Sequence, residues 1–452
     1  MKRIQRLLLT GIAALFMLSA SGCDLTKTSV ESVMVPPNLS DDQEKIYGAL
    51  NLEKRKNISL IYPRSGDFRS AYVIHDLDQE AGEEALVFYR ENTSAASPIK
   101  INVLDKNEES KEWYSVWVDS VIEQGEDDAN PLVKATEVEK VSFATFKNQT
   151  YVIIGFNVES ASANRMQMRA YKYVEGRLTC LASQDCAEYE VYDLNGDGQD
   201  EIILISASLE EGRNQSVSAR LYNLEEDQLN LLSEVPLNGN VSEYTGVYRG
   251  KLESGEPALY VDYTYGNETF TEILAARNDV IQSLIQPQNT GMIQQTKRLS
   301  GLGCEELKGN GVYYIPRNLP FLGSEGSANY YIDWMKYEEG KLVLEKHAYV
   351  DYSFGYYLDL PESWVNQVTM KKDSVNNEVL FYGYTGNIND DAEKILKIKV
   401  FVSSDLTDGE LPLGYDWLSN NGQLVFGFQT YENDLGIPKL TLDQVYQMFH
   451  YL

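Results

Sequence analysis

The sequence has few histidines, few cysteines and few basic residues, and each shortage argues against a class of function. Only three histidines occur in 452 residues, His75, His347 and His450, so a histidine-based hydrolytic triad is not expected. No G-x-S-x-G, P-loop or H-E-x-x-H motif is present either. These absences predict that the chain is not an enzyme.

Basic residues are also scarce relative to acidic ones. Lys and Arg total 39 against 68 Asp and Glu, which gives a formal net charge of -29. Because no basic run offers a stripe for phosphate groups, we expect no nucleic-acid partner. Hydrophobic residues make up 43% of the chain, an ordinary globular value, and the length favours two domains.

The cysteines are too scattered to form a CxxC redox motif or a zinc cluster. Cys180 and Cys186 could close a local disulfide in an exported protein, because we expect them to flank a turn between two strands. Buried reduced thiols are the alternative.

The N-terminus has the pattern of a secretory signal peptide. Basic residues at positions 2, 3 and 6 precede an apolar stretch over 7–18, which is shorter than the roughly 20 residues of a membrane-spanning helix. The segment Ala20-Ser21-Gly22-Cys23 then resembles the bacterial lipobox, with Ala20 where Leu is usual. The resemblance implies cleavage of a signal peptide, 1–22, and a lipidated tether, 23–40. Acyl chains on Cys23, palmitate among them, would anchor the protein at the extracytoplasmic face of the cell membrane.

Strands dominate the rest of the chain. Ser40 and Gln43 form a capping box for one short helix ending near Leu52, and Thr441 with Gln444 predicts a second helix at the C-terminus. Between them, short alternating apolar runs are bounded by Gly, Asn, Asp or Ser. We therefore expect a mainly β fold.

One loop between two expected strands has the spacing of a calcium site. Residues 193–201 read D-L-N-G-D-G-Q-D-E and run directly into an apolar strand. Oxygen atoms at positions 1, 3 and 5 can converge on one hard cation, a Gly at position 6 permits the sharp turn, and position 9 closes the cage. The expected ligands are Asp193, Asn195, Asp197, the Gln199 carbonyl and Glu201. A hairpin without metal is the alternative.

This D-x-N-x-D-G-x-x-E pattern resembles the calcium loop of FG-GAP and VCBS repeats, which lie between strands of integrin-type β-propeller blades. A second copy over 76–84 lacks the Gly at position 6 but offers a possible second metal loop with Asp76, Asp78, Glu80 and Glu84. Further copies begin near residues 143, 250 and 306; the first of these retains only the flanking strands, and the other two have lost the ligands. The resemblance implies a β-propeller of degenerate blades over 41–350 with structural Ca²⁺.

The character of the sequence changes near Asp351. Residues 352–364, which end in a Pro-x-x-Trp turn, look like the opening of PsbP-like domains. The resemblance implies a smaller α+β domain over 351–452. The alternative is that these strands form one or two further degenerate blades.

Together these features predict a membrane-anchored lipoprotein that acts as a binding or scaffolding module at the cell envelope, with an envelope protein or a glycan as its partner. The alternatives are an accessory or sensor lipoprotein of an envelope machine and, more remotely, a polysaccharide-active enzyme.

Overall fold

The computed structural model describes most of the chain after the N-terminal segment. The described residues are 40–50, 57–80, 82–92, 98–107, 109–123, 133–159, 165–207, 217–239, 241–285, 290–299, 301–324, 329–386 and 392–452. The predicted signal peptide and the lipobox with Cys23 lie outside them. No helix within these ranges is long and apolar enough to cross a membrane.

The fold is mainly β, as predicted, and the described strands form six antiparallel sheets. The first sheet has the order β1-β3-β4-β5, with β2 also paired to β3, and contains β1 (Ile58–Leu60), β2 (Tyr72–His75), β3 (Glu84–Glu91), β4 (Lys100–Lys106) and β5 (Trp113–Ser120). The second has the order β10-β9-β8-β7-β6 and contains β6 (Ile122–Glu123), β7 (Val133–Phe146), β8 (Gln149–Glu159), β9 (Arg165–Val174) and β10 (Arg177–Cys186).

The next two sheets are meanders of the same kind. The third has the order β11-β12-β13-β14 and contains β11 (Glu188–Tyr192), β12 (Glu201–Ala207), β13 (Val217–Glu225) and β14 (Gln228–Pro236). The fourth has the order β15-β16-β17-β18, with β19 also paired to β17, and contains β15 (Glu243–Lys251), β16 (Pro257–Tyr265), β17 (Glu268–Arg277), β18 (Val280–Ser283) and β19 (Arg298–Leu299).

The last two sheets share the C-terminal part of the chain. The fifth has the order β20-β21-β22-β23-β24-β30 and contains β20 (Glu305–Glu306), β21 (Tyr313–Pro320), β22 (Tyr330–Glu338), β23 (Lys341–Asp351), β24 (Tyr356–Leu360) and β30 (Phe449–Tyr451). The sixth has the order β25-β26-β27-β29-β28 and contains β25 (Val368–Asp373), β26 (Glu378–Gly383), β27 (Lys394–Val402), β28 (Asp416–Asn420) and β29 (Leu424–Thr430).

The described helices are short. They are α3 (Asp41–Ala49), α4 (Thr290–Gln295), α5 (Leu442–Met448), η2 (Glu362–Trp364), η3 (Ser403–Asp405) and η4 (Thr407–Gly409). Both predicted capping boxes are confirmed, at Ser40 with Gln43 and at Thr441 with Gln444. The C-terminal helix ends at Met448 rather than at the last residue, because the chain then turns into β30.

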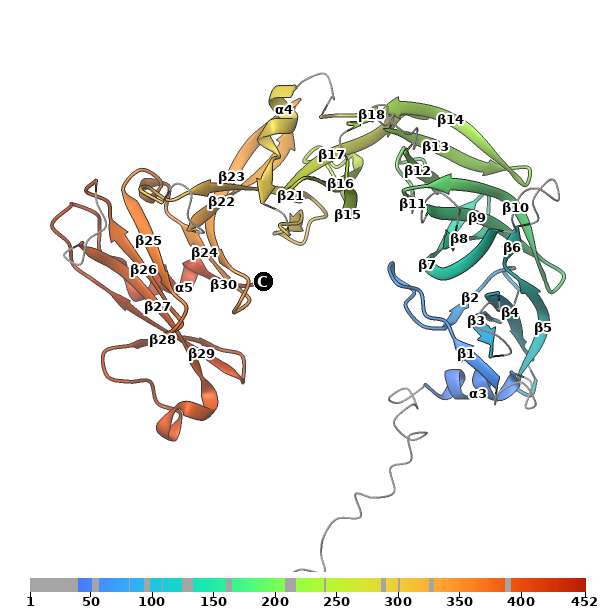
Figure 1. The fold of residues 1–452 in the computed structure, drawn as a ribbon, viewed down its shortest axis with the longest axis horizontal. Helices are drawn as coiled ribbons and strands as arrows, with labels where there is room; N and C mark the ends of the chain where they lie inside the picture. The colour runs from blue at the N-terminus through green and yellow to red at the C-terminus, as the bar shows by residue number, and fades with distance from the viewer. Residues whose placement is uncertain are drawn as a thin grey trace, which may run out of the picture.

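The predicted repeat corresponds to one sheet per copy. The five copies fall between β2 and β3, β7 and β8, β11 and β12, β15 and β16, and β20 and β21. In each of these five sheets, the loop of the repeat joins two of the strands that come first along the chain. Figure 1 shows the six sheets following one another in chain order along an arc whose first and last sheets do not meet. The described residues therefore do not confirm a closed propeller.

Hydrophobic cores lie between consecutive sheets, which is how successive β-layers bury their apolar faces. Representative pairs, in chain order, are Phe88 with Ile154, Met168 with Tyr189, Leu221 with Val261, Ile273 with Ile315, and Tyr349 with Phe381. Helix α3 covers the other face of the first sheet, where Ile46 packs near Val87. The arc is thus a continuous stack of sheets.

The expected domain boundary at Asp351 falls inside the fifth sheet. Strands β23 and β24 pair across it, with Val350 opposite Tyr357, and the final strand β30 pairs with β24. One core contains both Tyr331 and Phe381, which lie on either side of the boundary. An independent domain over 351–452 stays a prediction.

The proposed disulfide between Cys180 and Cys186 is not formed. Both residues lie on β10, because the turn comes earlier, at Glu175 and Gly176, which adopt positive φ angles. Six residues of extended strand separate the two Cα atoms by about 20 Å, far beyond the reach of a disulfide. The thiol of Cys186 is buried, in line with the alternative, whereas Cys180 is exposed.

Candidate metal centres

The loop that joins β11 to β12 wraps around the carboxylate of Asp193. One oxygen, Oδ1, accepts the backbone N–H groups of Gly196 (2.8 Å) and Asp197 (3.0 Å), and Oδ2 accepts that of Gly198 (2.9 Å). Gly196 and Gly198 have φ angles of +78° and +88°, which favour glycine. The glycines of the motif therefore allow the chain to turn around its first acidic residue.

Three of the predicted ligands converge in this loop. Asp193, Asp197 and Glu201 each offer a carboxylate oxygen, and these oxygens lie within 4.8 Å of one another. Glu201 is 2% exposed, and its Oε2 accepts the N–H groups of Leu194 (2.9 Å) and Asn195 (3.3 Å). Burial raises the pKa of Glu201 to about 7, and repulsion from the two aspartates adds to the shift. An all-oxygen set of this kind fits a hard divalent cation such as Ca²⁺.

The other two predicted ligands have additional contacts. Asn195 Oδ1 accepts the Asp197 N–H (2.8 Å), and its Nδ2 donates to Asp279 Oδ1 (2.8 Å) in the turn between β17 and β18. The side chain of Gln199 accepts the Lys147 N–H (2.8 Å) through Oε1. A role for the Gln199 carbonyl as a ligand stays a prediction.

The loop also contacts the two neighbouring sheets, which the motif alone did not indicate. Asp200 donates its N–H to the Thr145 carbonyl (3.0 Å) and accepts the Thr145 N–H at Oδ2 (2.8 Å). Thr145 belongs to β7 of the second sheet, and Asp279 belongs to the fourth. The candidate cation site thus lies at a junction of three sheets.

The loop between β2 and β3 is built in the same way. The N–H of Leu77 donates to Glu84 Oε2 (2.7 Å), as Leu194 does to Glu201. The N–H of Gln79 donates to Asp76 Oδ1 (2.7 Å), as Gly196 does to Asp193. Three hydrogen bonds recur at equivalent positions, since the bond from Glu80 N–H to Asp78 Oδ1 (3.0 Å) matches that from Asp197 to Asn195.

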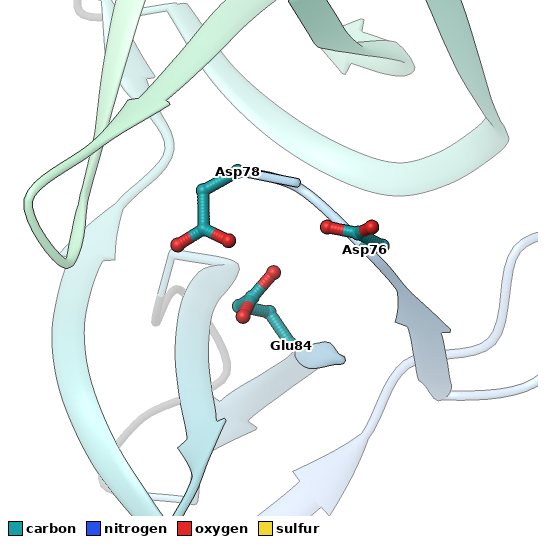
Figure 2. A group of neighbouring side chains, drawn as sticks. All are labelled: Asp76, Asp78 and Glu84. Carbon is teal, nitrogen blue, oxygen red and sulfur yellow. The ribbon is translucent and has the colours of Figure 1, made fainter. Parts of the chain in front are cut away.

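Figure 2 shows the carboxylates of Asp76, Asp78 and Glu84 gathered around one space. Their oxygens lie within 4.8 Å of one another, and Glu84 is 3% exposed. Burial raises the pKa of Glu84 to about 7. Glu80 lies outside this group and its side chain is exposed, so its role as a ligand stays a prediction.

The three histidines lie in separate structural contacts. His75 stacks on Phe143 with ring centroids 3.7 Å apart, and its pKa is lowered by burial. His347 Nδ1 lies 2.6 Å from Asp333 Oδ1, and His450 Nε2 lies 3.2 Å from Asp359 Oδ2. These contacts are consistent with the structural roles expected of isolated histidines.

No family model matches the chain, and no curated protein matches it. The resemblances to FG-GAP and VCBS repeats and to PsbP-like domains therefore stay predictions. Solved structures with a similar arrangement do exist. A rhamnogalacturonan lyase from Bacillus licheniformis is 11% identical, with 74% of this chain and 76% of that chain covered and a TM-score of 0.32.

Two further similar structures cover more of the chain. A second rhamnogalacturonan lyase is 12% identical, covers 86% of this chain and 94% of that chain, and has a TM-score of 0.33. An exo-β-1,3-galactanase from Phanerochaete chrysosporium is 12% identical, with 83% of this chain and 90% of that chain covered and a TM-score of 0.28. At these values no substrate or reaction is carried over to this chain.

The similar structures named above are two lyases and a galactanase, so the prediction that the chain is not an enzyme is withdrawn, and no activity is put in its place. The prediction rested on missing motifs. Glycoside hydrolysis uses a pair of carboxylates that have no fixed sequence spacing, so the absence of motifs cannot exclude it.

Proposed function

We propose that this protein is a lipoprotein, anchored through Cys23 at the extracytoplasmic face of the cell membrane, that acts as a calcium-braced binding module. The observation that carries the proposal is the carboxylate cluster of the loop over 193–201 at the junction of three sheets. The acidic surface would be repelled by anionic lipids, so attachment would depend on the acyl chains.

Calcium would act on stability in this proposal. Without a cation, Asp193, Asp197 and the buried Glu201 repel one another, and a divalent cation relieves that repulsion through bonds available only in the folded loop. Because Asp200 and Asn195 connect the loop to the second and fourth sheets, ordering the loop would also brace its neighbours. Calcium at 100 times its dissociation constant adds about 2.7 kcal/mol to the free energy of unfolding.

The test is thermal unfolding of the mature chain in millimolar calcium and in excess chelator. We expect a higher melting temperature in calcium, and we expect Asp197→Ala to abolish most of the gain. Ser254→Ala, in the copy that has lost its ligands, is the matched control and should leave the gain unchanged. Equal melting temperatures of the wild type in calcium and in chelator would contradict the proposal.

Activity on polysaccharides is measured in parallel, since rhamnogalacturonan and β-1,3-galactan are the polymers named for the similar structures. The assay follows the release of reducing ends and of unsaturated products. Release that requires the folded chain would assign a reaction to this module in addition to binding.

A further inference from the structure

The sixth sheet has one apolar face and one polar face. Met370, Phe381 and Phe426 are buried in the core shared with the fifth sheet. Side chains alternate along a strand, so Lys371 and its cross-strand neighbours point the other way. Figure 1 shows this sheet at the end of the arc, where no further sheet follows it.

Lysines and aromatic residues gather on the polar face. The register places Lys371, Leu380, Lys397 and Gln429 in one cross-strand row. A second row contains Asp373, Glu378, Lys399, Gly427 and Trp417. We define the lysine–aromatic face by six residues, namely Lys371, Lys394, Lys397, Lys399, Trp417 and Tyr431.

Three of the four lysines of this face, Lys394, Lys397 and Lys399, place their ammonium groups over aromatic rings. Lys397 Nζ is 5.3 Å from the centroid of the Tyr415 ring, and Lys394 Nζ is 5.8 Å from that of Tyr431. Gly427 leaves room for the rings, because a Cβ there would come within 3.4 Å of the Tyr415 ring. Trp417 is 42% exposed at the edge of the sheet. The face therefore offers flat rings with cations beside them.

The charge of this face is opposite to that of the rest of the protein. Residues 351–452 contain six basic residues, all lysines, and four of them belong to the face. The two rows contain two acidic residues, Asp373 and Glu378, and Glu378 pairs with Lys397 (2.9 Å) and Lys399 (2.7 Å). The four lysines of the face still outnumber these two acids, which leaves a local excess of positive charge. At physiological ionic strength, charges beyond about 8 Å are largely screened, so a ligand on this face would sense mainly its lysines.

We propose that the lysine–aromatic face binds a carboxylate-bearing polysaccharide, a chain of sugar rings that includes uronic acids. The apolar face of a sugar ring packs on the exposed ring of Trp417, and the carboxylates form charge-assisted hydrogen bonds with the exposed Lys371 and Lys394. The amide nitrogen of Gln429 donates to the Gly414 carbonyl (2.8 Å) and its Oε1 accepts the Tyr431 hydroxyl (2.7 Å), so this side chain is held in place and offers a sugar hydroxyl its second N–H. This inference rests on the proposed binding function and deepens it by naming a face and a ligand class.

Other partners fit the face less well. The cores of protein interfaces are depleted in Lys and Glu, whereas this face alternates lysines with aromatic residues. A planar anionic membrane would meet the acidic surface around the face and be repelled, whereas a narrow chain contacts the face alone. A polymer of alcohol phosphates without sugar rings would leave the aromatic residues unused.

The test is affinity electrophoresis of the mature chain in gels that contain hyaluronan, with carboxyl-reduced hyaluronan as the neutral comparison. We expect retardation by the acidic polymer only, and weaker retardation at high salt. The double variant Lys371→Gln, Lys394→Gln and the single variant Trp417→Ala should each bind about tenfold more weakly. Both lysines and Trp417 are exposed, so their replacement should leave the melting temperature unchanged.

Matched controls lie elsewhere on the molecule. Lys439→Gln removes an exposed lysine that pairs with Glu432, and Tyr265→Ala removes a ring that is 52% exposed on the fourth sheet. Both should bind as the wild type does. Equal loss in the controls, no retardation of the wild type, or lysine-dependent binding to anionic vesicles instead of hyaluronan would overturn the inference.

The calcium assay separates this inference from the proposed function. A chain that is stabilised by calcium but is not retarded by hyaluronan refutes the ligand and leaves the calcium brace in place. A chain that binds hyaluronan through these lysines but is not stabilised by calcium refutes the calcium brace and leaves the polysaccharide ligand in place.

Discussion

Replacing Glu201 with Gln should stabilise the calcium-free protein at neutral pH and remove its response to calcium. The ordinary pKa of this carboxyl is 4.5, and burial raises it to about 7 in the folded protein. Between these two values the folded protein holds a proton that the unfolded chain has released. The contribution of Glu201 to stability is therefore full below pH 4.5 and falls as the pH rises towards 7.

The size of this effect follows from the shift. One pKa unit corresponds to about 1.4 kcal/mol, so the upper bound is about 3 kcal/mol, and solvent around the loop reduces it. Gln carries no charge and can still accept the N–H of Leu194. We therefore expect calcium-free Glu201→Gln to be about 1–2 kcal/mol more stable than the wild type at pH 7.5 and equal to it at pH 4.5.

The stabilisation by calcium has the opposite pH dependence, because calcium competes with the proton on Glu201. At pH 5 a group with a pKa near 7 is ionised in about one molecule in a hundred, so calcium binds about 100-fold more weakly than to the ionised site. At calcium equal to 100 times the dissociation constant of the ionised site, the gain is about 2–3 kcal/mol at pH 7.5 and less than about 1 kcal/mol at pH 5.

The assay is denaturant unfolding at pH 5, 6 and 7.5 in calcium and in chelator. Glu272→Gln is the matched control, because Glu272 is 1% exposed and burial raises its pKa to about 7, but it belongs to neither acidic cluster. This control should gain stability at pH 7.5 and keep the full calcium response. If Glu201→Gln keeps the response, or if the gain in the wild type does not depend on pH, the assignment of Glu201 as a ligand is refuted.

Three further predictions concern other parts of the chain. Cys23→Ala should leave an unprocessed or released protein, and a variant that is cleaved normally and still fractionates with membranes would exclude the anchor. Strands β23 and β24 share a sheet, and one core spans residue 351, so we expect the fragment 305–452 to unfold cooperatively and the fragment 351–452 to be markedly less stable. Circular dichroism during unfolding measures both stabilities, and equal values would support a domain boundary at 351. Gly155→Ala would place a Cβ 2.8 Å from a tyrosine ring and should lower the free energy of unfolding by about 1–3 kcal/mol, as measured with denaturant. Gly48→Ala in α3, where the new Cβ has no atom within 4 Å, should raise the free energy of unfolding by about 0.5 kcal/mol.

The sequence predicted local structure well where the signal lies in a few adjacent residues. The capping boxes at Ser40 and Thr441 fixed the starts of two helices, and the spacing of acids and glycines over 193–201 placed three carboxylates around one point. The position of the repeated loops within their sheets could also be predicted, because each loop directly precedes an apolar strand.

Features that depend on distant segments could not be predicted in this way. Nothing near Asp200 in the sequence indicates that its partner is Thr145 of another sheet. The return of the final residues to β24 joins segments almost a hundred residues apart, so the boundary at Asp351 looked sharper in the sequence than the pairing makes it. The lysine–aromatic face was missed because strand alternation reveals it only once the pairing of β25, β26, β27 and β29 is known.

The three-sheet junction also has a consequence for the order of events during the export that we propose. The loop over 193–201 is supported by Thr145 on one side and Asp279 on the other, so its surroundings are incomplete until the chain has crossed the membrane at least to residue 279. Contacts between distant segments form late, because the chain must first close a long loop. Tight calcium binding would then be acquired only after most of the first four sheets has been delivered, and the ion would mark chains that have folded at least as far as residue 279.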